Sequence, residues 1–162
     1  MEETMKTRED IWATVSGLTD EQLNERVEPG KWTIMQVLEH LYLYERVAVQ
    51  NIAATLAEGV EQSADQKPYQ VVLNREMKVD APEQYVPSEN FITLAEIKSK
   101  LDESRQALLQ TVEGQGSDVL TKRSHQHRIF GLMDLQQWIS FIGLHEKRHL
   151  AQIEELKGAL RK

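Results

Sequence analysis

Apolar residues recur at helical spacing in four segments of the chain, and three of these segments open with the same start signal. A Thr or Asp that can cap a helix is followed three positions later by Gln or Glu. Apolar residues flank each pair, as in a capping box with a hydrophobic staple. The pairs are Thr33 with Gln36, Thr93 with Glu96, and Asp134 with Gln137. This pattern predicts three long helices that begin at these positions.

Glycines and the apolar spacing set the lengths of these helices. The first runs apolar through Ile52 to Gly59 and the second through Val112 to Gly114, since glycine commonly ends a helix. The third continues nearly to the C-terminus. A further helix with weaker signals precedes all three and is predicted over residues 3–15, where Ile11 and Val15 keep helical spacing.

Four helices without a convincing strand run predict an all-α fold, a four-helix bundle in a single domain over residues 1–162. The connection between the helix that ends at Gly59 and the helix that begins at Thr93, the second and third of the four, has about 30 residues. This is far more than a tight turn between helices needs. We therefore expect a long crossover connection that passes along the bundle. Within it, "YQVVLNREM" is expected to form a short extra helix, and "SHQHRIFG" before the last helix is expected to be a loop.

The composition excludes several classes of protein. A net charge of −7 argues against a nucleic-acid interface, because such interfaces neutralise phosphates with Lys and Arg. The chain has no apolar run of about 18 residues, so no membrane partner is expected. The acidic, polar start "MEETMKTRED" differs from a signal peptide and favours a cytoplasmic protein. Because there is no Cys, any metal must bind to His, Asp or Glu.

Two of the five histidines stand out, because His145 and His149 in "LHEKRHL" are four residues apart and share one helix face. Apolar residues occupy the same face: Leu135, Trp138, Ile142, Ile153 and Leu156. Two imidazoles that point into an apolar interior need partners, and a divalent metal ion would supply one. The alternative is a pair of partly exposed histidines at the end of the bundle that hydrogen-bond to carboxylates.

The string H-E-x-x-H is also the pattern of zinc peptidases. Those enzymes take a third ligand from downstream of the motif. Here only thirteen residues follow His149, they continue the same helix, and Glu154 and Glu155 lie beyond reach of the ion. We therefore expect no peptidase site. Glu146 is expected to lie beside the metal face or, preferentially, in solvent next to Lys147 and Arg148.

His40 in "VLEHLYLYE" is the best third ligand, because one helix that offers His and another that offers H-x-x-x-H can form a three-His site with open positions. A lone His at this place would otherwise be interpreted as a core or boundary residue. His125 and His127 lie in the expected loop, where exposure is the default interpretation. Either could border the pocket or replace His40.

The segments "GKWTIMQVLEHLYLYE" and "HRIFGLMDLQQWISFIGLHEKRHLAQI" resemble the DinB-like superfamily, particularly its YfiT-like branch, and the similarity covers nearly the whole chain. The resemblance implies a four-helix bundle with a long crossover, often a homodimer, that holds a divalent metal on three histidines. The three family histidines fall on His40, His145 and His149. His127 falls where many members have a His before the glycine turn, and no role is carried onto it.

The resemblance further implies a metal-dependent enzyme that activates a low-molecular-weight thiol such as bacillithiol for transfer to an electrophile. One alternative is a metal-dependent hydrolase that uses water on the metal. Another is a non-catalytic metal-binding, stress-associated protein, in which a fourth side chain such as Glu45 or His127 closes the site. Three imidazoles suit zinc or nickel best, with iron or manganese also acceptable.

Several other residues near these histidines are candidates for supporting roles. Glu45 and Glu146 are weak candidates for a catalytic base, and Gln36 and Gln152 are candidates for hydrogen bonding to the ligands. A cationic side chain could anchor a carboxylate of the thiol cosubstrate, although each candidate is more simply interpreted as solvated surface: Arg148, Arg128, Lys147 and Arg46.

Overall fold

Four long helices dominate the structure, a computed structural model that describes residues 1–160. They are α1 (Glu2–Val15), α3 (Ile34–Glu58), α4 (Leu94–Val112) and α6 (Leu135–Leu160). Two single-turn helices lie between them, α2 (Asp20–Leu23) and α5 (Ser117–Leu120). The expected all-α four-helix bundle is confirmed. Within residues 1–160, no helix is both long and apolar enough to cross a membrane.

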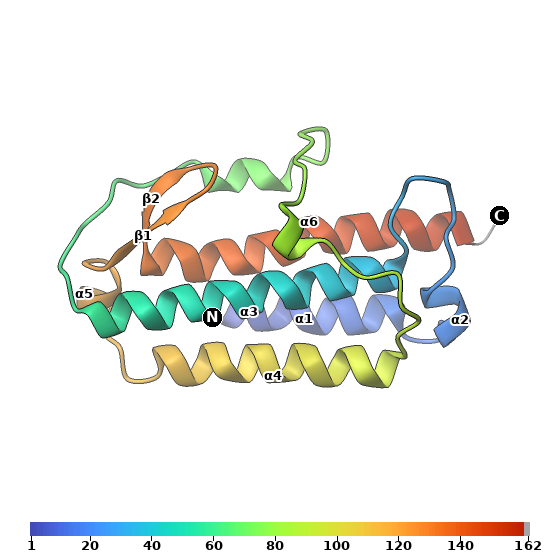
Figure 1. The fold of residues 1–162 in the computed structure, drawn as a ribbon, viewed down its shortest axis with the longest axis horizontal. Helices are drawn as coiled ribbons and strands as arrows, with labels where there is room; N and C mark the ends of the chain where they lie inside the picture. Colours follow the sequence, from blue (N-terminus) through green and yellow to red (C-terminus); the bar gives the residue numbers. More distant parts are fainter. Residues whose placement is uncertain (161–162) are drawn as a thin grey trace.

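The connection between α3 and α4 is the crossover, residues 59–93, and it decides how the helices are arranged. Figure 1 shows that α3 and α4 run in the same direction while α1 and α6 run in the opposite one. The crossover therefore has to return along the bundle before α4 can start. It contains two short 3-10 helices, η1 (Tyr69–Leu73) and η2 (Glu83–Tyr85). The expected extra helix in "YQVVLNREM" is thus present as η1, in a tighter form.

The capping signals form at all three predicted helix starts, although in different ways. Thr33 and Gln36 form a complete capping box, whereas the Thr93 side chain accepts a hydrogen bond from the backbone of Glu96 without the reciprocal bond. The Asp134 carboxylate accepts hydrogen bonds from the backbone N–H of Gln137, at 2.9 Å, and from its side chain, at 3.1 Å. Each cap satisfies backbone donors that a helix start leaves free.

The segment expected to be a loop before α6 is instead a β-hairpin, so this expectation was wrong. Strand β1 (Ser124–His127) pairs antiparallel with β2 (Gly131–Asp134), and Gly131 takes the positive φ of 79° that the turn requires. Strands of four residues carry little periodicity signal, and an isolated hairpin is only marginally stable. Tertiary contacts supply its stability: the Trp138 indole on α6 donates a hydrogen bond to the carbonyl of His125 at 3.0 Å.

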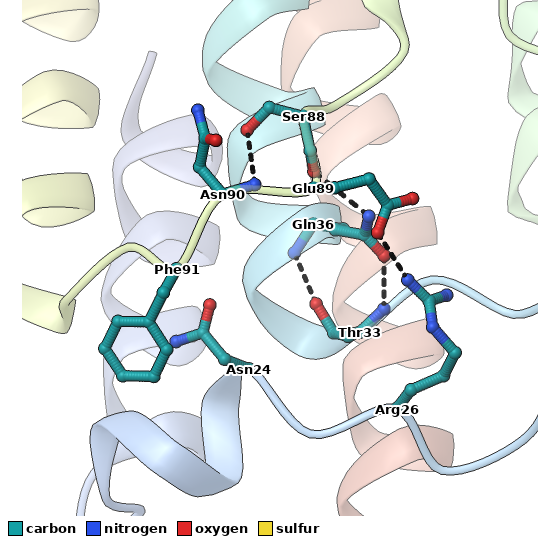
Figure 2. A pocket seen from close by; sticks show the side chains of 8 residues that line it. All are labelled: Asn24, Arg26, Thr33, Gln36, Ser88, Glu89, Asn90 and Phe91. Carbon is teal, nitrogen blue, oxygen red and sulfur yellow. Dashed lines mark hydrogen bonds and ion pairs between the residues drawn. The ribbon is translucent and has the colours of Figure 1, made fainter.

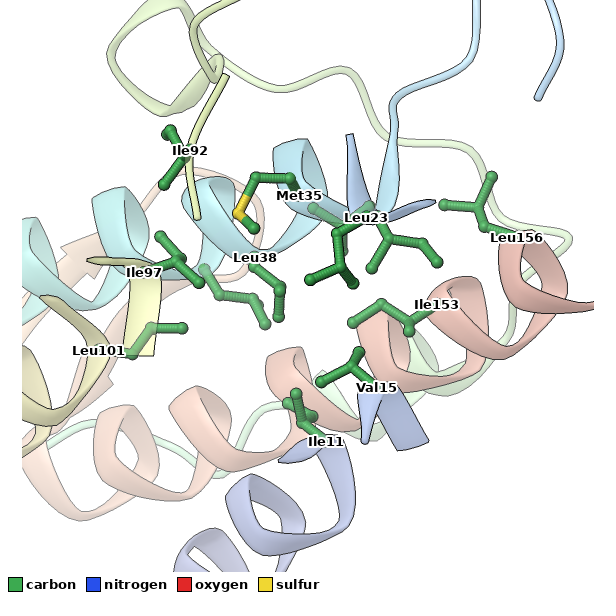
Figure 3. Close-up of a cluster of buried hydrophobic side chains, with 13 residues drawn as sticks. Ile11, Val15, Leu23, Met35, Leu38, Ile92, Ile97, Leu101, Ile153 and Leu156 are labelled. Atoms are coloured by element: carbon green, nitrogen blue, oxygen red, sulfur yellow. The ribbon is translucent and has the colours of Figure 1, made fainter. Parts of the chain in front are cut away.

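The core consists of two apolar clusters, one toward each end of the bundle. Figure 3 shows the first cluster, where Leu38 on α3 and Ile153 on α6 meet side chains of α1, α2 and α4. The second cluster includes Ala48 on α3, Ile142 on α6 and Met133 on the hairpin. Along α6, residues 145–149 lie between the parts that belong to each cluster. The polar residues discussed below therefore occupy a layer between two apolar cores.

Candidate metal centre

Three histidines from two helices converge in this polar layer. His40 comes from α3, and His145 and His149 come from successive turns of α6. One ligand nitrogen from each lies within 4.8 Å of the others, and the Nε2 atoms of His40 and His145 are 3.3 Å apart. We call these residues the histidine cluster. The structure thus brings together the three residues that the sequence suggested, while His125 and His127 are not part of the group.

Two of these rings are held by acceptors that fix which nitrogen carries the proton. His40 Nδ1 lies 2.8 Å from the carbonyl oxygen of Tyr85, and His149 Nδ1 lies 2.7 Å from Oε1 of Gln152. A carbonyl oxygen can only accept, so each Nδ1 donates and each Nε2 keeps a free lone pair. This is the arrangement that metal-binding histidines adopt. Gln152 was expected from the sequence, whereas Tyr85, in η2, carried no signal because its backbone makes the contact.

Burial keeps the histidine cluster uncharged. His40 and His149 are buried and His145 is partly exposed. Burial lowers the pKa of His40, and it lowers the pKa of His149 to about 3, with help from the nearby ring of His40. Burial is also the main reason why the pKa of His145 lies well below its usual value, and the two neighbouring imidazoles add to the effect. Neutral imidazole is the form that binds a metal.

The donor set fits a divalent transition-metal ion. Two nitrogen ligands at about 2.0–2.1 Å in a tetrahedral arrangement lie about 3.3 Å from each other. The separation of 3.3 Å between the Nε2 atoms of His40 and His145 matches this value. Imidazole nitrogens suit zinc, nickel or iron better than calcium or magnesium, which prefer oxygen. The structure therefore contains a three-His group that can hold such an ion.

Aromatic rings enclose the histidine cluster. The Tyr44 ring stacks on His145 with centroids 4.2 Å apart and an interplanar angle of 29°. The ring centroid of Phe141 lies 6.0 Å from those of both His145 and Tyr44, and the ring centroid of Trp32 lies 5.0 Å from that of His40. These rings limit solvent access and hold the imidazoles in place, which accounts for the desolvation that lowers their pKa values.

Glu146, the glutamate of the H-E-x-x-H string, was expected to face solvent, but it is buried. Its side chain is only 3% exposed, and Oε1 accepts a hydrogen bond from Nε of Arg8 at 2.8 Å. Its Oε2 accepts from Arg8 and from Arg105. Because α6 packs against its neighbours on more than one side, a position off the histidine face is still buried. Both carboxylate oxygens are occupied, which excludes Glu146 as an available base.

Glu45 belongs to the same group of charges. Its Oε1 lies 2.9 Å from Nη2 of Arg8, and its Oε2 lies 2.7 Å from Nε of Arg105. We call Arg8, Glu45, Arg105 and Glu146 the charge quartet. Each of the four long helices contributes one member, and all four side chains are at most 7% exposed. The two positive and two negative charges balance, so the quartet joins the four helices instead of supplying a base.

The four cationic candidates for anchoring a carboxylate divide into two groups. Arg148 was interpreted as surface but is buried, and it donates to the carbonyl groups of Val72, Asn74 and Met77, which fastens the crossover to α6. Lys147, Arg46 and Arg128 are exposed, as expected. Arg46 lies over the ring of Tyr42, and Arg128 is in the turn of the hairpin.

His127 was expected in an exposed loop, but it is buried on strand β1 with 5% of its surface exposed. Its Nδ1 accepts hydrogen bonds from the backbone N–H groups of Ile129 and Phe130 at 3.0 and 3.2 Å. The Nε2 atom must therefore carry the proton. Burial lowers the pKa of His127 to about 4, and the adjacent Arg128 charge adds to this. His125 on the same strand is partly exposed.

A pocket lies at the start of α3, one turn before His40, and Figure 2 shows its lining. Most of its polar side chains already have partners. Gln36 completes the cap with Thr33 and donates to the carbonyl of Ser88 at 3.0 Å, and Arg26 pairs with Glu89 at 2.9 Å. Gln36 therefore fastens the end of the crossover to α3 and does not support a histidine as the sequence suggested.

Comparisons with known proteins agree with this fold. A family model described as the DinB superfamily matches residues 3–153. YuaE of Bacillus subtilis (strain 168), described as an uncharacterized protein, is 32% identical over 152 residues, with 94% of this chain and 93% of YuaE covered. The crystal structure of TT2238, described as a four-helix bundle protein, superposes with a TM-score of 0.63 at 18% identity and covers 95% of this chain and 94% of TT2238. The structural likeness supports the fold alone.

Proposed function

The chain belongs to the DinB superfamily, and from this premise we propose that it is a metal-dependent enzyme that transfers a low-molecular-weight thiol to an electrophile. One observation carries the proposal. The histidine cluster offers three neutral imidazoles whose ligand nitrogens lie within 4.8 Å of one another, and hydrogen bonds to Tyr85 and Gln152 orient two of them. Such a constellation is built for a divalent ion.

The surroundings of the histidine cluster support an open site. A closed site would need a fourth protein ligand, and Glu45 and His127 were the candidates from the sequence. Both oxygens of Glu45 are held by arginines, and Nδ1 of His127 is occupied by backbone donors. Since zinc and similar ions take at least four ligands, a position remains for a small molecule. This arrangement favours an enzyme over a non-catalytic metal-binding protein.

The metal ion, the aromatic residues and the cosubstrate would each have a separate role in such a reaction. When bound, a divalent ion supplies Lewis acidity at its open position, which lowers the pKa of a thiol or of water placed there. Tyr44 and Phe141 shield one side of His145 and exclude water from it. The chain has no Cys, so the nucleophilic sulfur has to arrive with a cosubstrate. For the ion itself we propose zinc or nickel.

A thiol-transfer assay tests the proposal. Protein whose metal content has been measured is mixed with bacillithiol and 1-chloro-2,4-dinitrobenzene. The thiol sulfur forms a bond to the ring carbon, chloride leaves, and the thiol proton passes to solvent. We expect turnover that requires the metal and is lost in His149→Ala, with Arg46→Gln as the matched surface control.

Two results would argue against thiol transfer. If the metal-loaded protein is no faster than His149→Ala, the thiol-transfer function is wrong. If it instead hydrolyses p-nitrophenyl esters with metal but without thiol, the hydrolase alternative replaces it. Either result leaves the metal site itself to be judged by metal content.

A further inference from the structure

The turn of the hairpin carries one cation that the charge quartet and the surface ion pairs leave free. Arg128 Nη2 donates to the backbone carbonyl of Asp80 in the crossover at 3.2 Å. This contact holds the side chain between the hairpin and the crossover. Among residues 1–160, the salt bridges within 4.0 Å do not include Arg128. Arg128 is exposed, and its guanidinium still has donors to offer.

Two tyrosine side chains connect the crossover with the histidine cluster. The rings of Tyr44 and Tyr85 have centroids 5.1 Å apart, and Tyr44 stacks directly on His145. Tyr85 lies in the crossover, close along the chain to Asp80, whose carbonyl accepts from Arg128. The contact with Asp80 therefore holds the guanidinium against the crossover segment that carries Tyr85, and the two tyrosines connect this segment with His145.

His127 borders the same region. Its ring lies 4.7 Å from that of Phe141, which also lies 6.0 Å from His145. With Nδ1 accepting from the backbone, its Nε2–H is a fixed donor. Arg123 Nε is the one buried side-chain nitrogen or oxygen in residues 1–160 that has no hydrogen-bond partner. Within the same residues, Nε2 of His127 and the hydroxyl of Tyr44 have no hydrogen-bond partner and yet are not among the fully buried atoms, so both reach solvent.

We propose that Arg128, Tyr44, Tyr85 and His127 form a carboxylate-binding subsite beside the histidine cluster, which recognises an acidic group of the substrate or thiol cosubstrate. We call these four residues the polar rim. This inference rests on the proposed function, which places the reacting thiol at the histidine cluster. It specifies the chemical class of the ligand: an organic molecule with a carboxylate a few atoms away from its thiol.

The chemistry of the polar rim selects an anion over a cation. Arg128 is a permanent positive charge, His127 presents an N–H, and the two tyrosines present hydroxyl groups that can donate. A planar guanidinium binds a carboxylate through two parallel hydrogen bonds. A single cation with neutral donors suits a carboxylate better than a doubly charged phosphate, which usually attracts several basic residues.

Calorimetric titration with three small probes tests the inference. The probes are 3-mercaptopropionate, 2-mercaptoethanol, which replaces the carboxylate with a hydroxyl group, and propionate, which lacks the thiol. The metal-loaded protein should bind 3-mercaptopropionate about tenfold more tightly than 2-mercaptoethanol, because a hydrogen bond to a charged group contributes that much. Arg128→Gln should remove this preference, whereas Arg46→Gln, an exposed arginine over Tyr42, should keep it.

The outcomes separate the subsite from the proposed function. If 2-mercaptoethanol binds as tightly as 3-mercaptopropionate, or if the preference persists in Arg128→Gln, the subsite is wrong while thiol binding stands. If propionate binds in an Arg128-dependent manner but neither thiol adds affinity, the subsite stands and thiol transfer fails. If no probe binds, both are overturned. Tyr85→Phe, which removes only a hydroxyl group, should weaken 3-mercaptopropionate binding by a few fold and leave 2-mercaptoethanol unaffected.

Discussion

Replacing Glu146 with Gln is the most informative change to the chain. This variant distinguishes a glutamate that acts as the catalytic base of a peptidase from one that stabilises the fold. Glu146 accepts hydrogen bonds from Nε and Nη2 of Arg8, at 2.8 and 3.3 Å, and from Arg105. In a zinc peptidase the corresponding glutamate is a base, and its loss would abolish activity with little effect on stability. Here its loss should mainly affect stability.

The magnitude follows from the charge balance of the charge quartet. Two arginines and two glutamates sum to zero, and Glu146→Gln leaves a net charge of +1 among side chains that are at most 7% exposed. Removing one partner of a buried ion pair costs about 3–5 kcal/mol, since the remaining charge stays desolvated. A matched double variant, Arg8→Met with Glu146→Leu, removes one charge of each sign. It retains the pair between Glu45 and Arg105 at 2.7 Å.

Urea unfolding followed by circular dichroism measures both variants. We expect Glu146→Gln to lower the free energy of unfolding by about 3–5 kcal/mol. The double variant should lose clearly less than the sum of its two single changes, which a double-mutant cycle reports as coupling. Metal content should survive in the double variant. A loss below about 1 kcal/mol for Glu146→Gln, or additive effects, would refute the role assigned to the charge quartet.

Three further predictions concern the metal, pH and helix packing. His40→Ala should lose bound metal as measured by elemental analysis, and unchanged metal content would show that the ligand assignment is wrong. Burial lowers the pKa of His149 to about 3 in the folded chain. As the pH falls, His149 therefore takes up its proton at a higher pH in the unfolded chain than in the folded one. The metal-free protein should therefore lose stability progressively from about pH 6.5 down to about pH 3, and a flat profile of urea midpoints would contradict this. A Cβ at Gly143 would lie 3.2 Å from Cβ and 3.4 Å from Cα of Thr4 on α1, so Gly143→Ala should cost about 1–3 kcal/mol. Gly158→Ala, with nothing within 4 Å of its Cβ, should instead stabilise by about 0.5–1 kcal/mol.

The four long helices and the pairing of His145 with His149 could be predicted from the sequence because they depend on local spacing. A cap acts three residues away, as the hydrogen bond from the backbone of Gln36 to Thr33 shows. Two histidines four positions apart share a helix face wherever the helix lies. The choice of His40 as their companion needed only the bundle topology and the resemblance to a family.

The tertiary structure alone decided what surrounds these residues. Glu146 looked solvated because helical phase gives the direction of a side chain relative to its own helix, and its partner Arg8 is 138 residues away. The carbonyl of Tyr85 that orients His40 left no trace in the side-chain pattern, since any residue supplies a carbonyl. The hairpin that buries His127 depends on docking to Trp138 on α6. Local periodicity determines which residues share a face, whereas burial, charge pairing and backbone contacts depend on which distant segments pack against that face.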